Sequence, residues 1–266
     1  MAVTVHVLVD DCAGYNTVGI RAEHGLSLLV ETGKTSIVFD TGQSGSWLHN
    51  AELMGLETLS ADLLVLSHGH FDHTAGLPYL IPTHERMRLV AHPGCFERKL
   101  DEDGSDVGCP LGLEEIEERF RLELVEESGE IAPGVHLLTS LERRYEDPGT
   151  VVYHEVDGRR EPDPVWEDSS LVVETERGLL VLCGCAHAGI INIIHAAADL
   201  GDLYAIMGGL HLLESPSKRL RRVVGEMRSL GVSAVYPGHC TGEEATCLMK
   251  REMGARRIYA GQSITI

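Results

Sequence analysis

Short apolar stretches separated by turn residues run through the first third of the chain. Their patterns predict strands near residues 4–9, 26–31, 36–39 and 62–66, several of them bounded by Gly or Asp. A helix near residues 46–54 fits between the third and fourth of these strands. This part of the chain is therefore expected to contribute mainly to a sheet.

The last hundred residues alternate regularly between strand and helix patterns. They predict strands at 170–174, 179–182, 203–207 and 232–236, with further strands around Ile258 and Ile264. Helices are predicted at 188–200, 217–230 and 242–253, with Ser215 or Ser217 as the cap of the second. Because both ends of the chain contribute strands, we expect an α/β fold of two sheets with helices on their outer faces.

The segment between these two parts, residues 93–164, is acidic, rich in Pro and Gly, and weakly periodic. Its clearest features are a helical turn at 113–119 and strands near 121–125 and 136–138. A chain of 266 residues can bury one extended core. We therefore expect a single domain over residues 1–266, with a surface insertion around 93–164.

The charge balance limits the partners of the protein. The chain has 22 Lys and Arg against 41 Asp and Glu, a formal net charge of −19, which disfavours nucleic acids and anionic membrane surfaces as partners. An uninterrupted apolar run of about 18 residues is missing, and the first residues lack the pattern of a secretory signal. We expect a cytoplasmic protein, and the sequence leaves its oligomeric state open.

Histidine and cysteine direct attention to metal chemistry. The chain has 14 His and 7 Cys, and an odd number of scattered cysteines favours reduced thiols or metal ligands over a disulfide framework. The densest group of donors is SHGHFDH at 67–73, directly after an apolar strand. We predict two neighbouring metal sites there, one held by His68 and His70 and the other by Asp72 and His73.

The donor cluster at 67–73 resembles the H-x-H-x-D-H signature of the metallo-β-lactamase superfamily. Upstream, the strand that ends in Asp40 resembles the superfamily strand with an aspartate beside the site, and downstream YPGH, ending in His239, resembles the last ligand histidine. The resemblance implies the four-layer αβ/βα sandwich with two mixed sheets. It also implies a dinuclear site for two divalent cations, with zinc expected and manganese or iron as alternatives.

A narrower resemblance rests on five short segments: AEHGLS at 22–27, SHGH at 67–70, GCAHAGI at 184–190, GGLH at 208–211 and PGHCTG at 237–242. Together they resemble a subgroup related to the archaeal dihydropteroate-synthase-like enzymes of methanopterin biosynthesis. Those enzymes join a dihydropterin to a ribofuranosylaminobenzene phosphate, and other members of the subgroup are described only as metal-dependent hydrolases. The resemblance covers most of the chain.

The chain departs from the superfamily pattern at two ligand positions. Cys185 stands where the superfamily carries a bridging aspartate, and it is either a thiolate ligand or a small buried apolar residue. The usual histidine before the preceding pair of strands is missing. His187 is the first candidate to replace it, as a ligand or otherwise as a helix-capping or substrate-contacting residue, and Glu167 and Asp168 offer carboxylates nearby.

Further polar side chains follow or precede predicted strands, which places them at the same rim. His239 is expected to be a metal ligand, and His211 a proton donor or substrate contact. Asp40 is expected to orient a ligand histidine or a loop amide. Glu23 and His24 are expected near the mouth of the site.

Two other features have plainer explanations. The basic run KRLRR at 218–222 could anchor a phosphate, but a solvated helix face is the simpler interpretation. His136 could donate to a metal, yet exposure at the surface is the expected outcome for an isolated histidine.

These residues support three functions. The leading hypothesis is a hydrolase in which a metal-bound hydroxide attacks a phosphoester or another anionic small-molecule ester, with Asp72 or His211 assisting proton transfer. The resemblance implies an alternative, the pterin-using synthase, for which Phe71 and Trp166 could form the walls of a slot. The third is a non-catalytic sensor module with a closed metal coordination.

Overall fold

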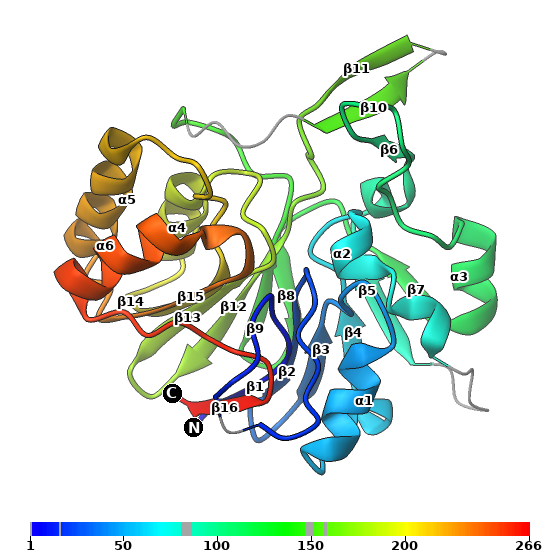
Figure 1. Ribbon diagram of the computed structural model, residues 1–266, viewed down its shortest axis with the longest axis horizontal. Coiled ribbons are helices and arrows are strands. Elements are labelled where there is room, and N and C mark those ends of the chain that lie inside the picture. Colours follow the sequence, from blue (N-terminus) through cyan, green and yellow to red (C-terminus); the bar gives the residue numbers. More distant parts are fainter. Residues whose placement is uncertain (1, 16, 81–86, 147–151, 157–158) are drawn as a thin grey trace.

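The structure is a computed structural model that describes residues 2–15, 17–80, 87–146, 152–156 and 159–266. Two large sheets pack face to face, and helices cover the outer face of each (Figure 1). The predicted four-layer α/β arrangement of mixed sheets is confirmed. Within the described residues, every helix is too short or too polar to cross a membrane.

The first sheet has seven strands and is built mainly from the N-terminal half of the chain. Its order is β16–β1–β2–β3–β4–β5–β7, in which β16 comes from the C-terminus. The strands are β1 (Thr4–Val9), β2 (Ser27–Glu31), β3 (Ser36–Phe39), β4 (Leu63–Val65), β5 (Arg88–Ala91), β7 (Arg121–Leu124) and β16 (Gln262–Thr265). Its helices are α1 (Ser46–Leu53), α2 (Phe71–Thr74) and α3 (Leu113–Arg119).

The second sheet has six strands in the order β15–β14–β13–β12–β9–β8. The strands are β8 (Gly129–Ala132), β9 (Val135–Leu138), β12 (Ser170–Thr175), β13 (Gly178–Cys183), β14 (Leu203–Gly209) and β15 (Ala234–Gly238). Its helices are α4 (Ile190–Ala198), α5 (Ser217–Ser229) and α6 (Glu243–Met253). Short 3-10 helices connect some elements: η1 (Thr58–Ser60), η2 (Leu77–Tyr79), η3 (Pro93–Phe96) and η4 (His239–Thr241).

The core follows from the two-residue period of the strands, as β13 illustrates. Leu180 and Leu182 belong to the apolar layer between the sheets, whereas Val181 and Cys183 pack under the outer helices. A strand buried on both faces therefore reads as a continuous apolar run, as the sequence of β13 does. These buried strands hold their C-terminal ends in fixed positions.

The segment 93–164 differs from the surface insertion expected for it. Its strands β7, β8 and β9 are part of the two main sheets. The remaining strands, β6 (Lys99–Leu100), β10 (Val152–Val156) and β11 (Arg159–Asp163), form a small third sheet that projects from the sandwich (Figure 1). Residues 147–151 and 157–158 of the predicted insertion lie outside the described residues.

Three local predictions need correction. Ile258 lies outside the strands, although the backbone N–H groups of Arg256 and Ile258 donate to the Val235 and Pro237 carbonyls of β15. Helix α5 begins after Pro216 without a side-chain cap from Ser215 or Ser217. Helix α4 begins at Ile190, since Gly189 has a φ of 89° that a helix cannot accommodate.

Candidate metal centre

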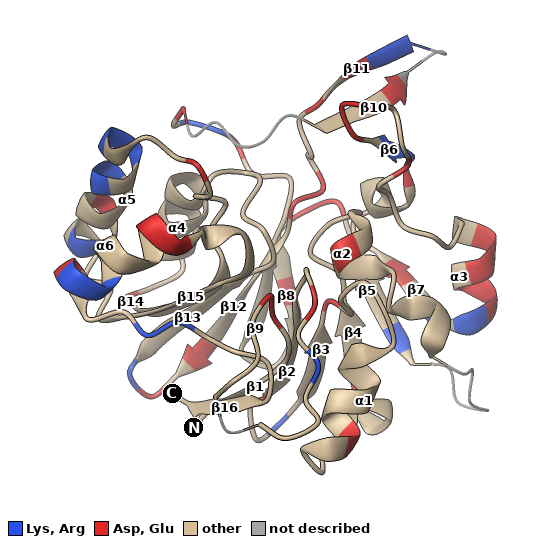
Figure 2. Cartoon of the chain, viewed as in Figure 1, with Lys and Arg blue, Asp and Glu red and all other residues tan. Residues whose placement is uncertain are grey.

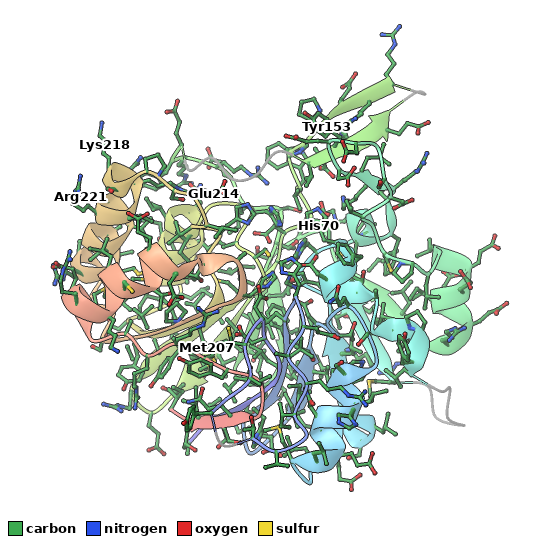
Figure 3. The ribbon with its side chains drawn as sticks, in the orientation of Figure 1. His70, Tyr153, Met207, Glu214, Lys218 and Arg221 are labelled. Atoms are coloured by element: carbon green, nitrogen blue, oxygen red, sulfur yellow. The ribbon has the colours of Figure 1, made fainter. Side chains whose placement is uncertain are left out.

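The polar side chains singled out by the sequence converge where strands of both sheets end. His68 and His70 follow β4, Cys185 and His187 follow β13, and His239 follows β15. Figure 3 shows His70 near the junction of the two halves of the sandwich. Because the strands are buried in the core, the backbone at their ends is fixed, and the donor residues that follow are fixed with it.

Four of these side chains form what we call the first donor group: Asp72, His73, Cys185 and His239. The His73 Nε2 atom lies 3.2 Å from His239 Nε2, 3.3 Å from Cys185 Sγ and 3.4 Å from Asp72 Oδ2. Ligands placed about 2.05 Å from a tetrahedral cation lie about 3.3 Å from one another. The spacing of the first donor group therefore fits a zinc-sized cation at its centre.

Three histidines form the second donor group: His68, His70 and His187. Their ring centroids lie 4.6 to 4.8 Å apart, and the Nε2 atom of each is buried without a hydrogen-bond partner. Buried polar atoms that lack a partner are costly, and a cation bound by the three nitrogens removes that cost. The second donor group therefore also fits a cation.

Asp40 supports one histidine in each donor group. Its Oδ2 atom accepts hydrogen bonds from Nδ1 of His73 at 2.7 Å and from the Ser67 hydroxyl at 2.6 Å. Ser67 Oγ lies 2.8 Å from Nδ1 of His68, and its backbone N–H donates to Asp40 Oδ1. Protons on both Nδ1 atoms leave the Nε2 lone pairs directed at the donor groups.

His239 is held in the same way by the acidic pair after β1. Its Nδ1 atom lies 2.8 Å from Asp11 Oδ1, and its backbone N–H donates to Asp10 Oδ1. Burial raises the pKa of Asp10 to about 6 despite these contacts. Burial also opposes ionisation of Asp11, but hydrogen bonds from His239 and His24 hold the pKa of that carboxyl well below its usual range.

The two donor groups differ in charge. Burial lowers the pKa of His68 and His187 well below the usual value and that of His70 to about 4, so these rings are neutral and can offer nitrogen lone pairs to a cation. In the first donor group, burial also lowers the pKa of His73, but the Asp72 and Asp40 carboxylates outweigh it and raise that pKa to about 9. The first donor group thus attracts positive charge more strongly.

A pocket of about 260 Å³ opens directly above both donor groups. Its floor contains His70 and His187 from the second group and Cys185 and His239 from the first. His211 lines the same pocket, with its ring centroid 4.4 Å from that of His187. Members of both donor groups and His211 therefore face one cavity that a small molecule can enter, whereas His68 and His73 are buried and do not line it.

Several residues expected near the site have other roles. Asp168 is buried and accepts a hydrogen bond from the Ala188 backbone, and burial raises its pKa to about 7. Glu167 forms an ion pair with Lys99. Both carboxylates support the loops behind the donors and lie outside the two donor groups.

Other expected residues lie away from the pocket. His136 faces Glu174 on the second sheet, 3.8 Å away, and Trp166 is 55% exposed beneath Arg143. Glu23 accepts hydrogen bonds from the loop at 43–44, whereas its neighbour His24 does reach the pocket. The basic run 218–222 lies on α5, which carries Lys and Arg in Figure 2. Figure 3 shows that Lys218 and Arg221 point away from the sandwich.

Two residues of the site were missed by the sequence analysis. Asp11 holds His239, and Cys240 lines the pocket beside it. A signal for Asp11 was present, because Asp10 and Asp11 follow a buried strand as Asp40 does. Cys240 carried a weaker signal, since a single cysteine after a histidine is often only a small core residue.

A four-layer sandwich with donor groups where the strands of both sheets end is a metal-dependent hydrolase fold. The profile of the metallo-β-lactamase superfamily matches residues 20–239, and the chain belongs to this superfamily. The crystal structure of Tm1679, a metal-dependent hydrolase of the β-lactamase superfamily, superimposes with a TM-score of 0.89 and 32% sequence identity, covering 99% of each chain.

Two curated proteins of Methanocaldococcus jannaschii are also similar over nearly the whole chain. A 7,8-dihydropterin-6-methyl-4-(β-D-ribofuranosyl)-aminobenzene-5′-phosphate synthase is 29% identical, covering 98% of this chain and 96% of its own. An uncharacterised protein is 32% identical, covering 91% of each. The relatives therefore include both a hydrolase and a synthase.

Proposed function

We propose that this protein is a hydrolase that uses two divalent cations to cleave a phosphoester or another anionic small-molecule ester. The histidine, cysteine and aspartate donors favour zinc as the cation. The observation that carries the proposal is the pocket of about 260 Å³ whose floor is made by both donor groups. A sensor module needs no such opening beside its ligands, so the pocket favours catalysis over a closed site.

When bound, two divalent cations supply a water of lowered pKa and polarise the bond that the water attacks. The residues of this chain orient the reaction. Asp72 Oδ2 lies 3.4 Å from His73 Nε2 and 3.2 Å from His239 Nε2, a position that suits a metal ligand. His211 lines the pocket outside both donor groups, so we assign proton transfer to this imidazole.

The pocket walls suggest the shape of the substrate. Phe71, Val107, Val152 and Leu213 supply apolar surface above the donor groups, and the described lining residues include neither Lys nor Arg. An anionic group of the substrate would therefore rest on the cations and imidazoles at the floor. The apolar walls would contact an uncharged ring or chain attached to it.

The experiment is a metal-depletion and reconstitution assay with bis(4-nitrophenyl) phosphate and 4-nitrophenyl acetate. Protein stripped by a chelator should lose activity, and zinc or manganese should restore it. His211→Ala should lower kcat by about 100-fold or more, while His136→Ala, a histidine outside the pocket, should leave it unchanged. Failure of every divalent metal to restore turnover on any ester would overturn the proposal.

A second candidate is the synthase reaction, favoured by the 29% identity to the archaeal pterin-using enzyme. In this case the floor of the pocket would bind the leaving group of a dihydropterin, and Phe71 would contact the ring. Titration of the metal-loaded protein with a dihydropterin, followed by ligand fluorescence, separates the two candidates. Tight saturable binding without ester hydrolysis would favour the synthase, because a general phosphoesterase has no reason to retain a pterin.

A further inference from the structure

Two thiols meet at the side of the pocket, above the end of β14. Cys185 follows β13 and Cys240 follows β15, and β14 lies between these two strands. Strand β14 ends in Gly209, where a Cβ atom would lie 2.8 Å from Cys240 Sγ and 2.2 Å from the Gly184 carbonyl oxygen. The missing side chain lets the chain segments after β13 and β15 approach each other across β14.

His211 completes this arrangement from the turn after β14. The three residues Cys185, His211 and Cys240 can each direct one ligand atom to a common region, with all three atoms within 4.8 Å of one another. The backbone N–H of His211 donates to Cys240 Sγ at 3.3 Å. His211 has a φ of 52°, a conformation that is unfavourable for a residue with a side chain.

The backbone conformation of His211 is stabilised by a residue of α5. Arg219 on α5 donates one hydrogen bond to the His211 carbonyl at 3.0 Å and another to the Ser215 hydroxyl at 2.7 Å. These two part-buried hydrogen bonds hold His211 in a backbone conformation that residues with a side chain rarely adopt, and such conformations are concentrated at functional sites. In this conformation the His211 imidazole lies close to the two sulfur atoms.

We propose that Cys185, His211 and Cys240 form a third cation position, which takes a thiophilic cation such as Zn²⁺, Cd²⁺ or Cu⁺. Two sulfur donors and one imidazole are the ligand set that such cations prefer over Mg²⁺ or Mn²⁺. Cys185 Sγ is also 3.3 Å from His73 Nε2, so Cys185 belongs to the first donor group as well and would be shared with the third position. Each thiol releases its proton when the cation binds.

A cation at this position also affects His211. A neutral imidazole has one lone pair, so His211 can accept a proton or bind a cation but cannot do both. Loading of the third position is therefore expected to inhibit turnover. This consequence rests on the proposed role of His211 in hydrolysis, whereas the cation position itself does not.

The test is an anaerobic titration of metal-free protein with Co²⁺ in the presence of a reductant, followed by the sulfur-to-cobalt charge-transfer absorption. The unsubstituted protein should bind three equivalents. Cys240→Ser and His211→Ala should each bind one equivalent fewer, and Cys240→Ser should also show a weaker charge-transfer band. Cys247→Ser, which changes an exposed cysteine on α6, is the matched control and should still bind three equivalents.

The titration gives an answer without an activity assay. Two results would overturn the third position. One is saturation of the unsubstituted protein at two equivalents of Co²⁺, and the other is binding of three equivalents by both Cys240→Ser and His211→Ala. Far-UV circular dichroism of each variant shows whether it is folded, and two variants on different segments keep the test informative if one of them unfolds. Two equivalents with full hydrolase activity would reject the third position and leave the proposed function standing.

Discussion

The Asp40 carboxylate lies 2.7 Å from Nδ1 of His73 and binds the Ser67 hydroxyl through the same oxygen. One buried carboxylate thereby orients His73 directly and His68 through Ser67. The two donor groups are therefore connected through Asp40 and Ser67, so a change at Asp40 is expected to affect both of them.

Asp40→Asn should weaken metal binding. The amide offers only one acceptor oxygen, so it cannot accept hydrogen bonds from His73 and Ser67 together with the Ser67 backbone N–H. We expect zinc affinity to fall by about 10- to 100-fold, measured by competition with a chromophoric chelator. Asp62→Asn, in an exposed contact with Ser36, is the control, and equal affinities in the two variants would refute the role of Asp40.

His70→Ala should remove one bound cation. The second donor group offers three imidazoles. Without His70 only His68 and His187 remain, and we expect a cation held by two protein ligands to be lost on dialysis. Metal analysis after dialysis should show one equivalent less than in the unsubstituted protein. His136→Ala should retain the full content, and retention of full content by His70→Ala would show that the second donor group binds no cation.

Lys99→Met should destabilise the fold. Lys99 is 1% exposed, and its ammonium lies 2.9 Å from Asp163 and 2.7 Å from Glu167. Removal of the cation leaves two buried carboxylates unpaired, which costs about 3–5 kcal/mol in the free energy of unfolding. Urea denaturation measures this cost.

The neighbouring residue provides the control for Lys99. Arg98 forms ion pairs with Asp106 and Glu155, but its side chain is 57% exposed, so Arg98→Met should cost less than about 1 kcal/mol. A loss below 1 kcal/mol in both variants would mean that the buried ion pairs around Lys99 contribute little.

Two glycine substitutions should have opposite effects on stability. Gly209→Ala forces a Cβ atom to within 2.2 Å of the Gly184 carbonyl oxygen, so we expect a loss of about 1–3 kcal/mol. Gly225 lies inside α5 with open space around it, and Gly225→Ala should stabilise the protein by about 0.5–1 kcal/mol. Thermal denaturation of both variants checks the signs, and a stable Gly209→Ala would contradict the close approach above β14.

The fold was predictable where the strands are buried and apolar along most of their length. Strands such as β3 and β13 are buried and apolar, so their sequences identified them and the donors that follow them. Strands β8 and β11 have no buried residue in their burial patterns and lack an apolar period, so the sequence did not reveal them. Their place was set by pairing with neighbouring strands.

The candidate site was predictable in its donors and less so in their support. The motif at 67–73 and the histidines at strand ends were recognisable, and the structure brings them into two neighbouring donor groups beside one pocket. The contact between Asp11 and His239 spans 228 residues, and the approach of Cys240 to Cys185 depends on Gly209. Pairings of this kind are set by tertiary geometry, which a local sequence pattern does not encode.

That separation along the chain has a consequence for biosynthesis. His73 Nε2 and His239 Nε2 lie 3.2 Å apart but are separated by 166 residues, so the first donor group spans most of the polypeptide. A nascent chain emerging from the ribosome carries the N-terminal donors long before β15 is translated. The first donor group can therefore be complete only after β15 has been translated, and a truncated product lacking its last strands would leave His73 without the histidine that faces it.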